Sequence, residues 1–392
     1  MKSGLTGSVR SLVVVGIMAL LISACGNGRS GGGGSGIGPL GSETPVTVSG
    51  VTPARGIFDP SLTENGGTLW MSYSVVNVSS NDPALPNINT RIASSTNGGR
   101  TWIDSGVAPN LAQDVVIVPG FPALDYWASW QFEVSRLVYD PHDIVARRWK
   151  LLWHRYLAAN QTGTVERRFQ HSWIGYTTAD SVAGLGGSER KLFVGSLYDA
   201  VTNGAAEYNL ATLYPAQLGG CQAFTEPGML VTAALPSGSN VYISLKCAGS
   251  SGKVVLLKCT GDFTAGNCTY RGDLLLDSEA QQFASTGQSY DGFSATELVA
   301  ASGRNFLIVT PTTNDEYRGC LVFEISNLDS ATLVGRPGNP TLLKRIGAST
   351  SAGFHGACGY TPGATVTGII YGKYSATATP PFRLFDTDVQ LP

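Results

Sequence analysis

The feature that most constrains the fold is a pair of segments that recurs five times between residue 54 and the C-terminus. Each copy has a polar stretch near an aromatic residue, then a turn signal, then an apolar run typical of a strand. Helical periodicity is hard to find here, so the repeat predicts an all-β protein of similar units. The polar stretches are FDPSL, VYDPH, FTEPGML, SATEL and GFHGAC, and the apolar runs are TLWMSYS, KLLWHRY, NVYISLKC, NFLIVTP and VTGIIYGKY.

The spacing of these segments predicts a five-bladed β-propeller over residues 51–392. In four units the start of the apolar run lies about ten residues after the polar residue, and the third unit needs about five more. Units of this size suit blades of ordinary length. An array of β-sandwiches is the alternative that such a divergent repeat leaves open.

The polar residues of the five units are expected to meet at one mouth of the central channel, because the first strand of each blade lines that channel. Pro60 fixes its own φ and biases the preceding residue away from helix, which helps to aim Asp59. The residues expected at this mouth are Asp59, Asp140, Glu226, Glu297 and His355.

The segment SSTNGGRTW predicts a tight turn between outer strands of the first unit. It matches the Asp-box pattern S-x-(D/N)-x-G-x-T-W, with Asn97 at the acidic position. We expect Asn97 and the glycines to hold the turn and Trp102 to pack beneath it, a structural role only.

Six cysteines follow the N-terminal region, and an even number in an exported chain suggests disulfides. Two of them flank TGDFTAGN with a hairpin-like spacing, two bracket a strand pair, and two remain for each other. A zinc site is the rival interpretation, but no CxxC or HxxxH spacing supports it. The predicted bridges are Cys221–Cys247, Cys259–Cys268 and Cys320–Cys358.

The N-terminus is typical of a targeting segment. Lys2 and Arg10 precede the short apolar run SLVVVGIMALLIS, which ends in LISAC. This resembles a bacterial lipoprotein signal, and the resemblance implies removal of residues 1–24 and acylation of Cys25. Gly26 after the cysteine favours the outer membrane by the same resemblance. An ordinary secretory signal with an incidental cysteine is the alternative.

Residues 25–50 contain the lipidated cysteine and a Gly/Ser-rich stretch that predicts a flexible tether. The chain has 26 Lys and Arg against 28 Asp and Glu, and no basic run indicates a nucleic-acid partner. We expect a monomer that contacts the membrane through its lipid only.

The units resemble the five-bladed glycosidases of the arabinanase/xylosidase and levanase/invertase type, on the residues DPSL, LWMSYS and the following Asp-box. The resemblance implies a base or nucleophile at Asp59, an orienting acid at Asp140 and a general acid at Glu226, with Glu297 as an alternative acid. Asp143 competes with Asp140. A sialidase is disfavoured, because the chain lacks an RIP motif.

The same resemblance implies a ligand or ion role for His355, such as a calcium ion on the axis, and no other cofactor. Sugars also need flat apolar faces, which Tyr126, Trp127 and Trp130 would provide at the rim, with Arg55 as a further substrate contact.

Two functions follow from this pattern. The first is a cell-envelope glycoside hydrolase, because cleavage needs one protonated acid and one ionised carboxylate. The alternative is a non-catalytic propeller that binds glycans or partner proteins at the cell surface.

Overall fold

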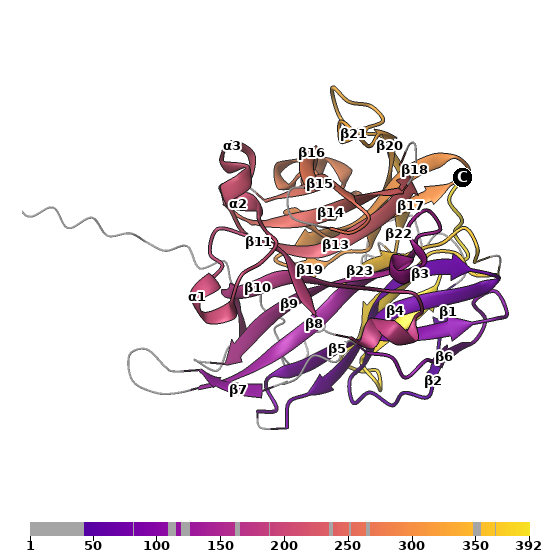
Figure 1. Ribbon diagram of the computed structural model, residues 1–392. Coiled ribbons are helices and arrows are strands. Elements are labelled where there is room, and N and C mark those ends of the chain that lie inside the picture. Colours follow the sequence, from indigo (N-terminus) through magenta and orange to yellow (C-terminus); the bar gives the residue numbers. More distant parts are fainter. Residues whose placement is uncertain are drawn as a thin grey trace, which may run out of the picture.

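The computed structural model describes residues 43–80, 82–108, 115–118, 126–160, 165–187, 189–234, 238–250, 252–263, 267–347, 354–364 and 366–392. The predicted signal segment, Cys25 and most of the tether lie outside these residues. Within them strands dominate and the few helices are short (Figure 1). None of those helices has the length and apolar character needed to cross a membrane.

The strands form five mainly antiparallel blades in chain order, as the sequence predicts. A parallel contact of β25 (Phe382–Asp386) with β3 (Gly56–Asn65) joins the fifth blade to the first in one hydrogen-bonded sheet. Short helices and turns connect the strands: α1 (Ala200–Asn203), α2 (Leu210–Leu213), α3 (Pro215–Leu218), η1 (Val145–Arg147), η2 (Ala183–Gly186) and η3 (Asp277–Phe283). Blade 1 contains β3 (Gly56–Asn65), β4 (Thr68–Val78), β5 (Pro86–Ser95), β6 (Trp102–Asp104) and the added β2 (Val48–Ser49). Blade 2 contains β8 (Tyr126–Tyr139), β9 (Trp149–Asn160), β10 (Val165–Ala179) and β11 (Arg190–Val194), flanked by β7 (Val115–Val118) and β12 (Tyr208–Asn209).

Blades 3 to 5 complete the molecule. Blade 3 contains β13 (Cys221–Ala233), β14 (Ser239–Gly249), β15 (Lys253–Thr260) and β16 (Cys268–Leu276); blade 4 contains β17 (Gly292–Ala301), β18 (Arg304–Thr313), β20 (Cys320–Asn327) and β22 (Leu342–Ile346), with the short β19 (Glu316–Tyr317) and β21 (Thr332–Leu333); blade 5 contains β23 (Phe354–Gly359), β24 (Ile370–Tyr374), β25 (Phe382–Asp386) and β1 (Thr44–Val46).

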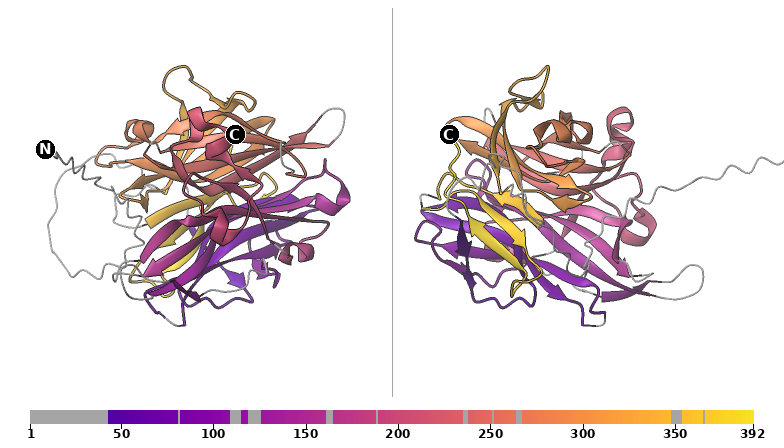
Figure 2. Two further views of the ribbon diagram at one scale, coloured as in Figure 1. Left: turned by 60° about the vertical axis from the view of Figure 1, so that its left-hand side comes forward. Right: turned by 180° about the vertical axis from the view of Figure 1, so that it is seen from behind.

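The blades surround one axis. The inner strands β3, β8, β13, β17 and β23 contact each other in that order, and β23 contacts β3 again, which closes the ring. Blade 5 lies between blade 1 and blade 4 (Figure 2). The N-terminal strand β1 pairs with β25, so both ends of the chain build the last blade and fasten the ring.

The larger apolar clusters lie between adjacent blades, and a smaller one, with Phe58, Val134, Ala295 and Ala357, joins the inner strands of four blades. Five of the buried clusters each combine side chains of two adjacent blades: blades 2 and 3, 3 and 4, 4 and 5, 5 and 1, and 1 and 2. Apolar residues on both faces of a blade are therefore buried, which explains the nearly continuous apolar runs of the sequence.

Those apolar runs form the second strand of each blade, not the first as the sequence suggested. They fall in β4, β9, β14, β18 and β24, whereas the polar stretches before them belong to the inner strands or, for VYDPH, to the end of one. The inner strand carries more polar residues because its side chains reach the axis, so it shows a weaker apolar signal.

Every inner strand is interrupted by a β-bulge at a similar height. One residue of each bulge has a positive φ, an unusual conformation for a residue other than glycine, and the pairing with the second strand shifts there. Bulges re-aim side chains next to functional sites. The five residues are Asp59 (51°), Val134 (47°), Glu226 (56°), Ala295 (21°) and Ala357 (48°).

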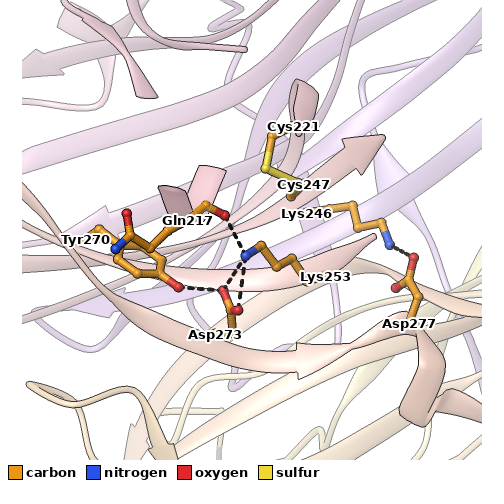
Figure 3. The surroundings of a disulfide bond; sticks show 8 residues. All are labelled: Gln217, Cys221, Lys246, Cys247, Lys253, Tyr270, Asp273 and Asp277. Carbon is orange, nitrogen blue, oxygen red and sulfur yellow. Dashed lines mark hydrogen bonds and ion pairs between the residues drawn. A yellow bond between two sulfur atoms is a disulfide. The ribbon is translucent and has the colours of Figure 1, made fainter. Parts of the chain in front are cut away.

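All three predicted disulfides are present. Cys221–Cys247 joins β13 to β14, Cys259–Cys268 closes the hairpin of β15 and β16, and Cys320–Cys358 joins blade 4 to blade 5. Around the first bridge, Lys253 reaches Gln217 and Asp273 (Figure 3).

The turn between β5 and β6 also has the predicted construction. The Asn97 Oδ1 accepts hydrogen bonds from the Thr101 amide at 3.1 Å and from the Ser95 hydroxyl at 2.9 Å, and Trp102 is buried. Its assignment as an Asp-box stays a prediction.

Candidate active site

Three carboxyl groups from the inner strands of blades 1, 2 and 3 form a buried cluster on the axis. Asp59 lies on β3, Glu133 on β8 and Glu226 on β13, and their exposed fractions are 2 %, 7 % and 1 %. The charges of Glu133 and Glu226 both act on Asp59, and Glu226 also acts on Glu133. We name these three residues the carboxyl cluster. Like charges confined in this way oppose each other's ionisation.

Asp59 is the member of the cluster that most favours its protonated form. Burial and the neighbouring Glu133 raise the pKa of Asp59 to about 8, against the lowering effects of Ser74 and Arg136. The Ser74 hydroxyl donates to Asp59 Oδ2 at 2.8 Å, while Oδ1 is buried without a hydrogen-bond partner. A carboxyl with so few donors and two acidic neighbours retains its proton at neutral pH.

Glu226 has the opposite environment. Its Oε2 accepts from the Ser294 hydroxyl and from the Ala295 amide at 2.5 Å, and its Oε1 accepts from the Tyr317 hydroxyl at 3.1 Å. The Arg167 guanidinium lies 3.6 Å from the same Oε1. Both oxygens of Glu226 therefore accept hydrogen bonds, and Oε1 also lies near a cation.

Glu133 connects the cluster to Arg167. Its Oε1 accepts from the Tyr156 hydroxyl at 2.8 Å and lies 3.4 Å from Arg167 Nη2. Burial raises the pKa of Glu133, whereas Arg167 and Tyr156 oppose that rise. The Arg167 guanidinium also lies 4.9 Å from the centre of the Tyr156 ring and is one-third exposed. Arg167 is therefore a cation that touches two acids of the cluster and also reaches solvent.

The structure places Asp140 outside the carboxyl cluster, directly after the end of β8, whereas Glu133 lies in the middle of that strand. Asp140 Oδ2 lies 3.4 Å from Lys150 Nζ, and its competitor Asp143 lies 2.6 Å from the same atom. The loop from residue 140 to 148, with η1 in it, separates β8 from β9, whereas only residues 66 and 67 separate β3 from β4. The residue about ten positions before the apolar run of blade 2 therefore falls in this loop and not in the bulge of β8.

Glu297 is also outside the carboxyl cluster. It lies on β17, two residues after the bulge residue Ala295, and is paired with Arg136 at 3.0 Å. Burial raises the pKa of Glu297, and Arg136 opposes that rise.

His355 belongs to the interior of blade 5 and does not reach the carboxyl cluster. Its ring packs against Tyr371, 6.4 Å between ring centroids, and its Nδ1 lies 3.1 Å from the Gly347 carbonyl oxygen. Burial and the nearby Lys373 lower the pKa of His355. The adjacent carboxylate of Glu43 is already bonded to Tyr371 and Lys373.

These surroundings do not fit an axial calcium ion, which takes about 6–8 oxygen ligands. A lysine stands beside His355, and the described ranges contain no group of three or more His, Cys, Asp or Glu side chains arranged to bind a metal.

The predicted substrate contacts have different partners in the structure. Arg55 donates to the Pro83 carbonyl oxygen at 3.2 Å, and no ion pair joins it to Asp59 among the described residues. Trp127 is 38 % exposed, whereas Trp130 packs against Trp173 and against the Arg155 guanidinium at 4.7 Å. For Tyr126 only the backbone, at the start of β8, is described.

Four contributors to the site escaped prediction from the sequence: Glu133, Tyr156, Arg167 and Tyr317. Asp59 and Glu226 each precede a proline inside their bulge, which made them visible. The bulge of β8 has Val134 and Ser135 instead, so it carries no such mark. The usable signal was the position of Glu133 within the long strand before Asp140.

Comparisons with known proteins place the chain near solved glycoside hydrolases by shape alone. No family model matches the chain, and no curated protein matches it. A thermostable family-43 glycoside hydrolase shares 12 % identity over 87 % of this chain and 90 % of its own, with a TM-score of 0.44. An arabinanase of Bacillus subtilis shares 12 % over 84 % and 93 %, with a TM-score of 0.41.

A third solved structure is the catalytic domain of a GH62 α-L-arabinofuranosidase of Coprinopsis cinerea. It shares 11 % identity over 89 % of this chain and 95 % of its own, with a TM-score of 0.44. At this level of similarity the function has to be argued from the site itself.

Proposed function

We propose that the protein is a glycoside hydrolase whose acid–base chemistry is carried by Asp59, Glu133 and Glu226. One observation carries the proposal: inner strands of three successive blades bring three coupled carboxyl groups together at the axis. Two of these groups sit on strained bulge residues. Such strain persists where the surrounding structure holds it, and it concentrates at functional sites.

The cluster gives its carboxyl groups different surroundings, and glycoside cleavage needs carboxyl groups in two different forms. A protonated acid must face the leaving oxygen, and an ionised carboxylate must act on the other side of the sugar. In the free protein Asp59 holds a proton, while hydrogen-bond donors surround Glu226. Coupled carboxyls whose environments separate their protonation states are the usual way to obtain this division.

This distribution reverses the roles that the resemblance implied for Asp59 and Glu226. We assign the role of proton donor to Asp59 and the role of the second carboxyl group to Glu226, whose oxygens accept from Ser294, Ala295 and Tyr317. Glu133 takes the place expected for Asp140: it adjusts the charge of the other two and holds Arg167 near them.

A screen of the purified protein against aryl glycosides and polysaccharides of pentoses and hexoses tests the proposal. We expect hydrolysis of at least one class, and a loss of roughly 10²–10⁴-fold in turnover for Asp59→Asn and for Glu226→Gln. Asp180→Asn, on the exposed surface, is the matched control. If no substrate is turned over while a glycan binds, the non-catalytic propeller replaces the hydrolase.

We propose further that the domain works at the cell envelope. A substitution of Cys25 tests this. The apolar run before LISAC and the glycine-rich stretch after it support a lipid anchor followed by a tether. With such an anchor the substrate is a glycan that reaches the membrane surface.

A further inference from the structure

Below the carboxyl cluster a buried Arg–Glu pair crosses the axis of the propeller. Arg136 lies on β8 in blade 2 and Glu297 on β17 in blade 4, and blade 3 stands between these blades in the ring. Arg136 Nε lies 3.0 Å from Glu297 Oε2, and both side chains are almost entirely buried. A pair that joins non-adjacent blades has to pass through the centre.

The sequence provides the space for this crossing. Arg136 and Glu297 each lie two residues after the positive-φ residue of their bulge, and the corresponding residues of blades 1, 3 and 5 are Ser61, Gly228 and Gly359. A Cβ atom on Gly228 would come within 2.4 Å of Ser244 Oγ, and one on Gly359 within 2.5 Å of the Pro60 carbonyl oxygen. Small residues therefore occupy three of the five equivalent positions, and the two long side chains of Arg136 and Glu297 occupy the others.

Arg136 is fixed by its hydrogen bonds. Its Nε donates to the Thr296 carbonyl oxygen at 2.7 Å and its Nη1 to the Ser135 carbonyl oxygen at 2.8 Å, while Nη2 is buried without a hydrogen-bond partner. Ser61 donates to Glu297. The guanidinium therefore keeps one place and one orientation at the axis, and its positive charge has no access to water.

We propose that Arg136 is a positioning residue for the carboxyl cluster: held across the axis by Glu297, it places a buried cation at the centre of the propeller, two residues after the bulge residue Val134. The proposal rests on the proposed function for its role in the reaction. The groups that act on Asp59 are Glu133 and Arg136 of β8 and Glu226 of β13, and Tyr317 of β19 also senses its charge. Arg136 is the cation of this set.

The electrostatics agree with this geometry. Arg136 lowers the pKa of Asp59, against burial, Glu133 and Glu226, which raise it. Removing the guanidinium should therefore raise the pH at which Asp59 loses its proton. A cation within a few ångströms shifts a carboxyl by roughly 1–3 pH units.

The test is a titration of the Asp59 carboxyl in the whole protein, followed by ¹³C NMR with labelled aspartate and assigned by the signal missing in Asp59→Asn. The double variant Arg136→Met with Glu297→Gln removes the guanidinium together with its ionisable partner, which avoids an unpaired buried ion. We expect its Asp59 midpoint to rise by roughly 1 pH unit or more. Arg304→Met with Glu324→Gln, a pair of blade 4 that is remote from the cluster, should leave the midpoint unchanged.

A second variant guards against a loss of fold. Glu297→Gln alone keeps the cation, so the Asp59 midpoint should stay at or below that of the parent. An unchanged midpoint in a double variant with a native near-ultraviolet circular dichroism spectrum would overturn the proposal, as would a rise in Glu297→Gln. If the parent turns over no substrate, the proposed hydrolase function is wrong. The titration still decides whether Arg136 acts on Asp59.

Discussion

Replacing Asp59 with asparagine tests how the buried cluster holds its protons. Asparagine keeps the shape of the protonated carboxyl and can still accept from Ser74, but it cannot ionise. In the parent the pKa of Asp59 rises from an ordinary value near 3.8 to about 8, chiefly because the group is buried. The folded protein therefore binds this proton more tightly than the unfolded chain does.

The sign and size of the effect follow from this difference. The stability that the protonated carboxyl contributes is complete below about pH 4 and is lost as the pH rises through about 8. Each pH unit inside this window costs the parent about 1.4 kcal/mol of unfolding free energy for this proton. From pH 5 to pH 7 the parent should therefore lose about 3 kcal/mol more than Asp59→Asn.

Urea unfolding with intact disulfides at pH 5, 6 and 7, followed by tryptophan fluorescence, measures this difference. Asp180→Asn serves as the control because Asp180 is exposed. Its unfolding free energy should change with pH as that of the parent does. If the unfolding free energies of Asp59→Asn and the parent change equally with pH, the argument is refuted. Asp59 would then have the same proton affinity in the folded protein and in the unfolded chain.

Further predictions concern other parts of the molecule. Lys150→Met leaves Asp140 buried without its cation and should lower the unfolding free energy by about 3–5 kcal/mol in chemical denaturation; a loss below about 1 kcal/mol would contradict this. Cys25→Ala should release the protein from membranes or stall its processing, and unchanged membrane association would argue against lipidation. On aryl glycosides with good leaving groups, Asp59→Asn should keep much more activity than Glu226→Gln, because such substrates need no proton donor; the opposite ranking would restore the roles implied by the resemblance.

The sequence predicted the blades and the disulfides because both depend on local pattern. Apolar runs bounded by turn residues mark strands wherever they lie in a blade, and two of the three cysteine pairs join neighbouring strands of one ladder. The third pair, Cys320–Cys358, joins two blades and was predicted only because these cysteines remained. The identity of the inner strand was harder to predict. Its bulge breaks the alternation of side chains, so the polar residues looked like a turn before the first strand.

The carboxyl cluster was only partly predictable for the same reason. The sequence contains the same acid–proline pattern at Asp59-Pro60, Asp140-Pro141 and Glu226-Pro227. Two of them occupy bulges, and the third follows the end of β8. Only the pairing of β8 with β9 shows that Glu133 stands next to the bulge of blade 2. Contacts between residues far apart in the chain, such as Arg136 with Glu297, leave no local mark at all.

The account depends most on the claim that Glu133, rather than Asp140, is the second-blade acid of the active site. The direct measurement is the turnover of the parent, Glu133→Gln and Asp140→Asn on the best substrate of the screen, with thermal unfolding as the check on folding. The account predicts a loss of roughly 10²-fold or more for Glu133→Gln and near-parental turnover per folded molecule for Asp140→Asn. Full activity in Glu133→Gln, or a greater loss in Asp140→Asn at equal folding, would contradict it.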